Sequence, residues 1–222
     1  TSAEFAYAAS AIAQAENLVV LFGSEGLGLK ESAALAQACA NLLVLTEHVN
    51  RPNNGLIGVW SRANDQGAYE IGLRPLPDLT DAIKQAEALY VAGADPAGDD
   101  PALVAAIKST GFLVVQELFL TETAKLADVV LPVLPFTERE GSFTSGERRV
   151  QRFYPAVLAK GEARADFMIT GQISQLAGVQ TETNSAARVF TQLAAKVSAF
   201  NGLTFRQLAQ VHEQWPLVGR SD

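Results

Sequence analysis

The stretch Leu89-Tyr-Val-Ala-Gly-Ala-Asp-Pro96 passes from a short apolar run into a glycine turn. A run of this length with little polar interruption is typical of a strand that is buried on both faces. Pro101 predicts the start of a helix, and the apolar residues 112–116 predict the next strand. The order strand, helix, strand favours a parallel pair of strands joined by a crossover helix.

Three more short apolar segments predict strands, at residues 18–22, 42–45 and 128–131. None of them shows the alternation of apolar and polar residues that a half-exposed sheet requires. Helical patterns at residues 2–16 and 29–41 stand before and between the first two strands. The predicted fold class is therefore α/β, with a doubly wound, mostly parallel sheet of about five strands and helices on both faces.

The character of the sequence changes after Gln151, where three helical stretches follow, at residues 165–176, 186–199 and 204–214. We expect an α/β domain over residues 1–155 and a helical extension over residues 156–222 that packs on it. Residues 46–77 fit neither pattern and are rich in turn-forming asparagine, glycine and proline. Trp60 and Tyr69 in this irregular segment are candidates for a contact with another subunit.

The composition excludes several classes of protein. The 222 residues include 48% hydrophobic ones and have a net charge of −7, so a nucleic-acid backbone is not an expected partner. No apolar run approaches the roughly 20 residues of a membrane-spanning helix, which predicts no direct membrane insertion. The single cysteine, Cys39, excludes an internal disulfide and a four-cysteine iron–sulfur site within this chain. Two histidines far apart in the sequence favour no metal site.

The strand at residues 128–131 is followed by a segment of different chemistry. Pro132 ends the strand, because proline has no backbone N–H to donate to a neighbouring strand. Residues 138–146 are rich in charge, glycine and hydroxyl groups. They are predicted to form a polar loop near the carboxyl ends of the strands, where ligands of open α/β sheets bind. An ordinary surface loop is the alternative.

A set of short motifs in this region resembles the molybdopterin oxidoreductase superfamily. The motifs are Thr121-Glu-Thr-Ala124, Ala127-Asp-Val-Val-Leu-Pro132, Glu138, Glu140-Gly141, Glu147 and Arg149-Val-Gln151. Tyr90-Val-Ala-Gly-Ala-Asp-Pro96 and Asn64-Asp-Gln-Gly67 add to the likeness, which extends over about residues 18–217. Within the superfamily the sequence looks most like the large iron–sulfur subunits of respiratory complex I.

The resemblance implies a remnant of a pterin-nucleotide site at Gly93, Asp95, Thr121, Thr123 and Asp128, since the matching turn of the active enzymes helps to hold the guanosine part of the cofactor. The residues themselves leave simpler roles open. The two threonines and Asp95 could cap turns, and Asp128 could accept hydrogen bonds from backbone amides. The resemblance implies no catalytic residue and no metal ligand in this chain.

Two positions depart from the family pattern. Ser145 and Arg148 stand where family members often carry an asparagine and a glycine. The complex I likeness implies an architectural segment that supports electron transfer from NADH to quinone, next to other peripheral-arm subunits, in the cytoplasm at the inner membrane. Iron–sulfur clusters are then expected in a preceding part of the protein and not in this one. The alternative is a cofactor-binding segment of an active enzyme such as a formate dehydrogenase or nitrate reductase.

Three other features of the sequence are possible sites. Gly23, Gly26 and Gly28 lie at a strand-to-helix turn that could hold a phosphate or could simply need glycine for its backbone angles. Cys39 is expected in the core and not as a redox centre. Carboxylates at positions 138, 140 and 147 are expected to pair with arginines at 139, 148, 149 or 152 and not to act as an acid/base pair.

Overall fold

The computed structural model describes residues 2–23, 27 and 29–210, which form two compact units. The first unit contains the described residues up to Leu73 together with Phe143–Gln151. The second contains Arg74–Ser142 and Arg152–Gln210. The predicted domain boundary between residues 155 and 156 stays a prediction.

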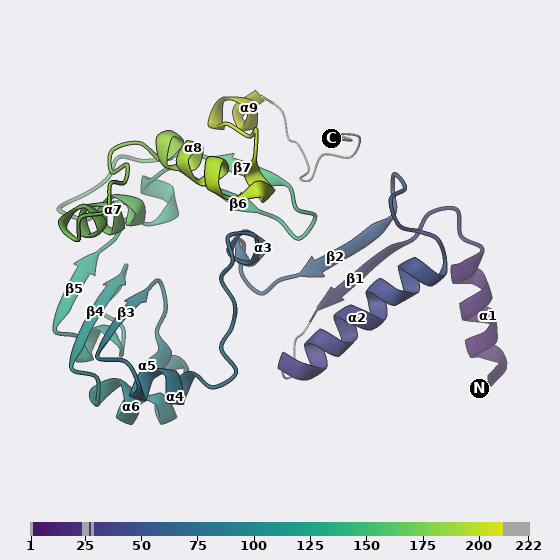
Figure 1. Ribbon diagram of the computed structural model, residues 1–222, viewed down its shortest axis with the longest axis horizontal. Helices are drawn as coiled ribbons and strands as arrows, with labels where there is room; N and C mark the ends of the chain where they lie inside the picture. Colours follow the sequence, from purple (N-terminus) through teal and green to yellow (C-terminus); the bar gives the residue numbers. More distant parts are fainter. Residues whose placement is uncertain (1, 24–26, 28, 211–222) are drawn as a thin grey trace. The chain divides into compact units, whose positions relative to one another are not determined.

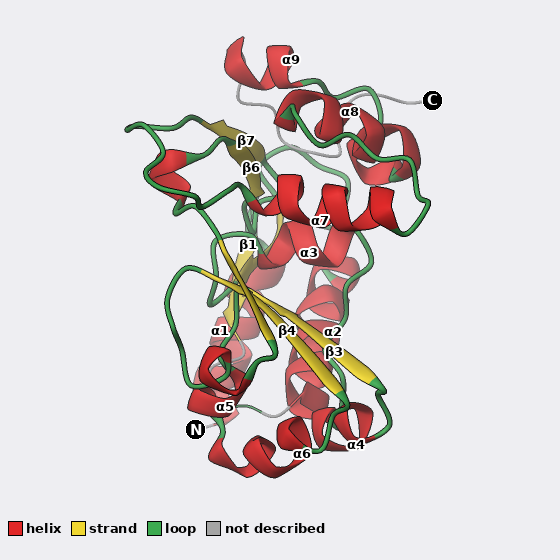
Figure 2. Ribbon diagram, turned by 90° about the vertical axis from the view of Figure 1, so that its left-hand side faces the viewer, coloured by secondary structure: helices red, strands yellow, loops and turns green. Residues whose placement is uncertain are grey.

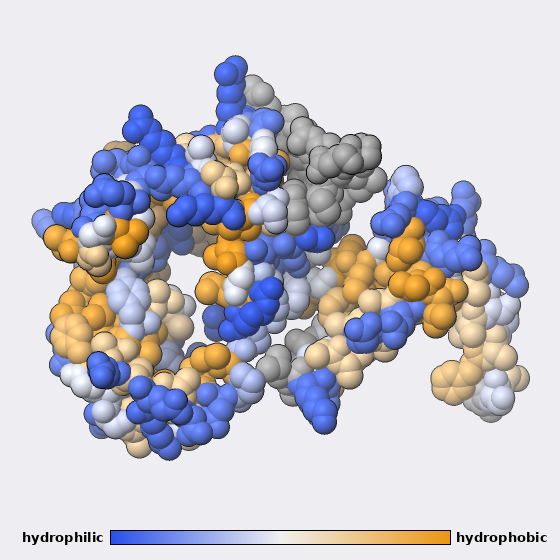
Figure 3. Space-filling model, in the orientation of Figure 1, coloured by the Kyte–Doolittle hydropathy of each residue, from blue (hydrophilic) through white to orange (hydrophobic). Residues whose placement is uncertain are grey.

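The first unit is built around a pair of parallel strands. Its elements are α1 (Ser2–Ala13), β1 (Val19–Gly23), α2 (Leu29–Leu45), β2 (Gly55–Val59) and α3 (Asp65–Glu70). Val19 lies opposite Gly55 and Gly23 opposite Val59, and α2 packs against both strands (Figure 1). Phe5 and Tyr7 of α1 are each 78% exposed, and Figure 3 shows apolar surface over α1 and α2.

The second strand of this unit is not the one that the sequence predicts. Residues 42–45 are the last turn of α2, and the strand is β2, inside the segment predicted to be irregular. Of this apolar run only Leu43 is buried, while Leu45 is 81% exposed. A short apolar run cannot be told from a helix end by periodicity alone, and here the alanine-rich helix continues through it. The turn before β2 is closed by left-handed Asn50 and Asn53.

The second unit holds a three-stranded parallel sheet in the order β3-β4-β5 (Figure 1), of which β3 and β4 are labelled side by side in Figure 2. Its elements are α4 (Leu79–Lys84), β3 (Ala88–Ala92), α5 (Pro96–Asp99), η1 (Pro101–Leu103), α6 (Val104–Lys108), β4 (Phe112–Glu117), η2 (Ala124–Leu126) and β5 (Val129–Pro132). Val115 in the central strand is fully buried in a cluster with Ile107 and Leu113. The predicted α/β fold class, with parallel strands and intervening helices, is confirmed.

The segment predicted to be a polar loop contains regular structure. After η3 (Phe136–Glu138) the chain forms β6 (Gly141–Thr144), which pairs with β7 (Val150–Phe153) in a two-stranded sheet. Arg148 lies in the left-handed region with a φ of 61°, and its N–H donates to the carbonyl of Ser145 at 2.8 Å. The turn after β6 reverses the chain. The prediction of a loop over residues 138–146 was therefore wrong at residues 141–144, which form a strand.

The helices predicted after Gln151 are present as α7 (Asp166–Leu176), α8 (Ala186–Lys196) and α9 (Phe205–Gln210), with η4 (Ser198–Phe200) between the last two. Phe190 of α8 packs on Phe200 and Phe205, with ring centroids 6.0 and 4.9 Å apart. The end of the third predicted helix, residues 211–214, lies outside the described residues. No helix among the described residues is both long and apolar enough to cross a membrane.

Candidate functional site

The turn after β3 depends on a left-handed glycine. Gly93 has a φ of 62°, and its N–H donates to the carbonyl of Gln116 in β4 at 2.9 Å. A Cβ atom at this position would meet no atom within 4 Å. The requirement for glycine is therefore one of backbone conformation and not of space. The turn directs the chain from the end of β3 to Asp95, which caps α5.

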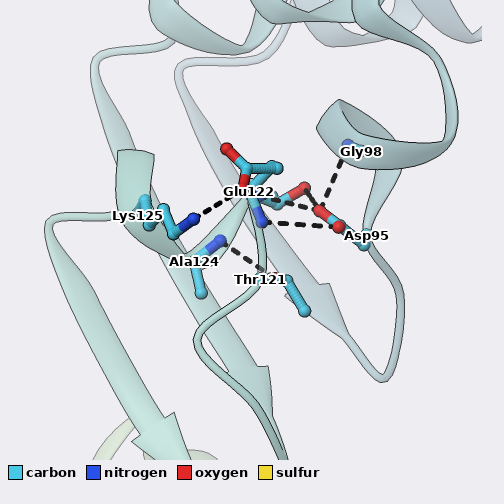
Figure 4. Close-up of polar contacts among 7 residues, drawn as sticks. Asp95, Gly98, Thr121, Glu122, Ala124 and Lys125 are labelled. Carbon is cyan, nitrogen blue, oxygen red and sulfur yellow. Dashed lines mark hydrogen bonds and ion pairs between the residues drawn. The ribbon is translucent and has the colours of Figure 1, made fainter.

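Asp95 is the acceptor at the centre of a cluster that joins two separate connections (Figure 4). Its Oδ1 accepts hydrogen bonds from the hydroxyl and the N–H of Thr123, at 2.7 and 2.8 Å, and from the N–H of Gly98 at 3.2 Å. Its Oδ2 has one longer contact, at 3.4 Å, with the N–H of Glu122. The hydroxyl of Thr123, followed by its backbone N–H, lowers the pKa of the Asp95 carboxyl below its ordinary value. Asp95 is therefore an ionised, acceptor-only group at neutral pH.

The two threonines of this cluster have different positions. Thr123 is fully buried, and its hydroxyl donates to Asp95 while accepting from the N–H of Ala97 at 2.9 Å. Its only proton is therefore used inside the protein, and its geometric role is to orient Asp95. The hydroxyl of Thr121 accepts from the N–H of Ala124 at 3.2 Å and so caps the short turn of η2.

Asp128 does not lie with the other predicted residues. Its Oδ2 accepts from the N–H of Leu113 at 2.8 Å, which is the backbone alternative that the sequence left open. Leu113 is near the start of β4 and Asp128 directly precedes β5, so this contact lies at the amino end of the sheet. The structure thus brings together Gly93, Asp95, Thr121 and Thr123 after the carboxyl ends of β3 and β4, apart from Asp128. Whether any of the five binds a nucleotide stays a prediction.

A polar network around the buried side chain of Gln116 was not predicted from the sequence. Gln116 is 1% exposed, and its Nε2 donates to Oδ1 of Asp166 at 2.9 Å while its Oε1 accepts from the hydroxyl of Tyr90. Arg139 Nε lies 3.4 Å from the second carboxylate oxygen of Asp166. Burial, and then the negative charge of Asp166, raise the pKa of the Tyr90 hydroxyl. The sequence signal was a glutamine near the end of an otherwise apolar strand.

The acidic and basic residues of the 138–152 region pair only partly as predicted. Glu140 pairs with Arg152 at 2.8 Å, as expected. Arg148 pairs with Glu70 at 2.9 Å, a residue that the sequence did not suggest. Glu138 accepts from the backbone N–H of Lys160 at 3.1 Å. These carboxylates serve structural contacts in the second unit and in the first.

The remaining candidates are in the first unit. Trp60 stacks on Tyr69 with centroids 5.3 Å apart, and its Nε1 donates to Gln66 at 3.1 Å. The two rings pack on each other, and their part in a subunit contact stays a prediction. Cys39 is half-buried and free. Of the predicted phosphate-binding turn, Gly26 and Gly28 lie outside the described residues. Among the described residues, no group of three histidine, cysteine, aspartate or glutamate side chains could hold a metal ion.

Comparison with known proteins gives a consistent family. The molybdopterin oxidoreductase family matches residues 4–176. The alpha subunit of F420-dependent formate dehydrogenase 2 from Methanococcus maripaludis is 33% identical over 218 residues, covering 81% of this chain and 32% of that protein. Formate dehydrogenase H from Escherichia coli is 27% identical over 262 residues, covering all of this chain and 37% of that protein. A putative formate dehydrogenase from Bacillus subtilis is 30% identical over 246 residues, covering 90% of this chain and 24% of that protein.

The chain thus spans about a third of the length of the first two of these relatives. The relatives carry the names of formate dehydrogenases, which supports the alternative drawn from the sequence better than the likeness to complex I. The family match covers well over half of the residues and includes the turn of Gly93 and the cluster of Asp95 and Thr123. The chain therefore belongs to the molybdopterin oxidoreductase family.

Proposed function

We propose that this chain is a cofactor-binding segment of a molybdopterin-dependent formate dehydrogenase. The proposal rests on the family match and on the names of the relatives, two of which are formate dehydrogenases and one a putative formate dehydrogenase. Family membership alone does not identify a substrate, since one fold can host different reactions. The substrate is therefore proposed from the relatives, and the cofactor site from the geometry of the chain itself.

The observation that carries the cofactor site is the free capacity of Asp95. Three of its hydrogen bonds are on Oδ1, while within the described part of the chain Oδ2 receives only the 3.4 Å contact from Glu122. An ionised carboxylate that follows the carboxyl end of a parallel strand accepts well from neutral N–H and O–H groups and repels phosphates. This acceptor fits the N–H groups of the guanine edge or the hydroxyls of the ribose of a pterin dinucleotide and does not fit its pyrophosphate.

The other residues of the cluster would hold this carboxylate in place. Gly93 sets the direction of the turn, and Thr123 fixes the carboxylate from the neighbouring connection. When bound, the pterin dinucleotide supplies the molybdenum or tungsten atom at which the oxidoreduction takes place. The described residues offer no cluster of metal ligands, so the contribution proposed for this chain is to bind and orient the nucleotide.

The complex I reading remains the competing hypothesis. It rests on the likeness of the sequence motifs to the complex I subunit, and the departures at Ser145 and Arg148 agree with its requirement that no pterin be bound. It requires peripheral-arm partners, a cytoplasmic position at the membrane and iron–sulfur clusters in another part of the protein. It also requires that the cluster around Asp95 bind no pterin. The two hypotheses therefore differ in one measurable quantity, the pterin and metal content of the protein.

The experiment is to purify the natural protein that carries this chain and to measure molybdenum and tungsten by mass spectrometry, and pterin by fluorescence after oxidation. We expect metal and pterin in near-stoichiometric amounts, together with formate-dependent reduction of an artificial electron acceptor. A protein without pterin that oxidises NADH in a quinone-reducing complex would overturn the proposal. Pterin in a protein that does not oxidise formate would support the proposed cofactor site and contradict the proposed substrate.

A substitution tests the role of Asp95 directly. Asp95→Asn keeps the shape of the side chain but removes the charge, and we expect a severalfold lower pterin content at unchanged protein yield. Asp81→Asn makes the same chemical change on the exposed first turn of α4 and should leave the pterin content unaltered. Equal pterin content in the two variants would remove Asp95 from the site.

A further inference from the structure

The dipeptide Asn-Gly occurs twice in the chain, as Asn54-Gly55 and as Asn201-Gly202. In such a pair the backbone nitrogen of the glycine can attack the side-chain carbonyl carbon of the asparagine, because glycine has no Cβ to hinder the approach. The nitrogen gives up its proton, the new C–N bond closes a cyclic succinimide, and the side-chain amide leaves as ammonia. Water then opens the ring at one of its carbonyls and yields aspartate or isoaspartate. The reaction needs no oxidant, metal or cofactor, so the local structure decides where it occurs.

The first pair is fixed by hydrogen bonds on both of its reacting groups. Oδ1 of Asn54 accepts from the N–H of Leu18 at 2.7 Å. Its Nδ2 donates to the carbonyl of Pro52 at 2.8 Å and to Oδ1 of Asn17 at 3.2 Å. The N–H of Gly55 donates to the carbonyl of Leu18 at 3.0 Å, where β2 begins to pair with β1. The glycine nitrogen and the asparagine side chain can therefore meet only after the start of this strand pair has opened.

The second pair lies in the connection between α8 and α9 (Figure 1), where the N–H of Leu203 donates to the carbonyl of Phe200 at 3.0 Å. Asn201 has a φ of −57° and a ψ of 130°, and Gly202 has a φ of 80°. These angles are typical of a type II turn with glycine at its third position. Both residues are exposed, and within the described part of the chain neither the side chain of Asn201 nor the N–H of Gly202 has a hydrogen-bond partner. These two groups can therefore meet when this turn alone opens.

We propose that Asn201 is a site of spontaneous deamidation in the folded protein, and that the fold protects Asn54 from the same reaction. Opening the turn at Asn201 breaks the hydrogen bond between Leu203 and Phe200. Opening the segment at Asn54 breaks the four hydrogen bonds described above, so its reactive form is less populated. Each half of this comparison depends on contacts within one of the two units. The inference is independent of the proposed function, because it uses neither the cofactor nor the cluster around Asp95.

The product at position 201 depends on which ring carbonyl the water attacks. Aspartate changes only the charge of an exposed side chain. Isoaspartate also routes the backbone through the side chain, and so adds a methylene group to the chain between Phe200 and Leu203, which are both buried. The ring of Phe200 packs on Phe190 of α8 with centroids 6.0 Å apart. An isoaspartate therefore disturbs a buried contact among the helices after Gln151, whereas an aspartate does not.

The test compares the two asparagines within one sample. The complete 222-residue chain is incubated in heavy-oxygen water, digested with trypsin and analysed by mass spectrometry, so that only deamidation during the incubation carries the label. Cleavage after Lys196 and Arg206 gives a peptide in which Asn201 is the only asparagine. We expect label at Asn201 to accumulate about tenfold faster than at Asn54, because a protected site reacts only through its open form. Equal rates in the folded protein, or a faster rate at Asn54, would overturn the proposal. The two rates should become similar in urea, and a difference that persists there would reject the fold as its cause.

Two variants separate the causes and the consequences. Asn17→Ala removes an exposed acceptor of the Asn54 side chain and should speed the reaction at Asn54 severalfold without changing the rate at Asn201. An unchanged rate at Asn54 would reject protection by its side-chain hydrogen bonds. Asn201→Asp carries the charge of the product without the extra methylene group, so it should melt at the temperature of the unmodified chain, and the purified isoaspartate form should melt at a lower one. Equal melting temperatures of the aspartate and isoaspartate forms would contradict the effect on packing.

Discussion

The hydroxyl of Thr123 donates to Oδ1 of Asp95 at 2.7 Å, across 28 positions of the sequence. The same hydroxyl accepts from the N–H of Ala97 at 2.9 Å, and the N–H of Thr123 donates to Asp95 at 2.8 Å. One buried threonine thus makes three contacts with the connection that follows β3. These contacts explain why Asp95 is ionised and where its carboxylate lies, and they make Thr123 the first residue to test.

Thr123→Val keeps the shape of the side chain and removes its hydroxyl. The N–H of Ala97 then loses its acceptor and Asp95 loses its shortest donor, so we expect the free energy of unfolding to fall by about 1–3 kcal/mol. Urea denaturation measures the change. Thr110→Val is the matched control, because the hydroxyl of Thr110 is buried without a hydrogen-bond partner among the described residues. Its removal should be neutral or stabilising, and an equal loss in both variants would contradict the role of the Thr123 hydroxyl.

The cluster predicts a pH dependence of stability. The pKa of Asp95 is lower in the folded protein than in the unfolded chain. The unfolded state therefore binds a proton first as the pH falls, and the stabilisation by Asp95 is complete above its ordinary carboxyl pKa. It is lost as the pH falls through the lower, folded value. Thermal unfolding across this acidic range should show a flatter pH profile for Asp95→Asn than for the unchanged protein, and parallel profiles would refute the assignment.

The turn between β6 and β7 contains a non-glycine residue in the left-handed region. Arg148→Gly should relieve about 1–2 kcal/mol of backbone strain, because glycine adopts this conformation freely. It also removes the ion pair with Glu70, whose contribution is about 0–1 kcal/mol since the arginine is 41% exposed. We therefore expect no net loss of stability from Arg148→Gly in thermal denaturation. Arg148→Ala removes the pair and keeps the strain, so it should be the less stable variant.

The titration of Tyr90 reports on the hydrogen-bonded network of Tyr90, Gln116 and Asp166. Burial is the larger cause of its raised pKa and the charge of Asp166 the smaller one. Asp166→Asn should therefore lower the pKa of Tyr90 while leaving it above the ordinary value for tyrosine. Ultraviolet difference titration of the phenolate measures this shift, with Tyr90→Phe identifying the signal. An unchanged titration would show that Asp166 does not act on this hydroxyl.

The sequence predicted the parts of the fold that follow from continuous apolar runs between turns. β1, β3, β4 and β5 were found this way, as were the three helices after Gln151. It failed at residues 42–45, where a short apolar run continues a helix, and at β2, which two glycines conceal. The strand β6 was missed because its polar composition is that of a loop. The spacing of apolar residues does not distinguish helix, strand and loop in these three segments. Pairing with other parts of the fold determines their structure.

The sequence was sufficient to name the residues of the candidate site but not to predict the hydrogen bonds between them. The likeness of the motifs to the family led to Gly93, Asp95 and Thr123 as candidates. That Asp95 and Thr123 touch depends on the two connections meeting after separate strands, and no local pattern encodes this. Asp128 belongs to one of the same motifs. It directly precedes β5, however, and because β5 is parallel to β4 it lies at the amino end of the sheet, opposite to Asp95.

The double use of the Thr123 hydroxyl has a mechanical consequence. The hydroxyl of Thr123 donates to Asp95 and accepts from the backbone of α5, and the N–H groups of Thr123 and Glu122 also donate to Asp95. The segments after β3 and β4 are therefore joined by several hydrogen bonds around one buried side chain. Neither segment can move outward alone without breaking these hydrogen bonds. Any opening or closing at this edge of the sheet therefore moves the segments after β3 and β4 together.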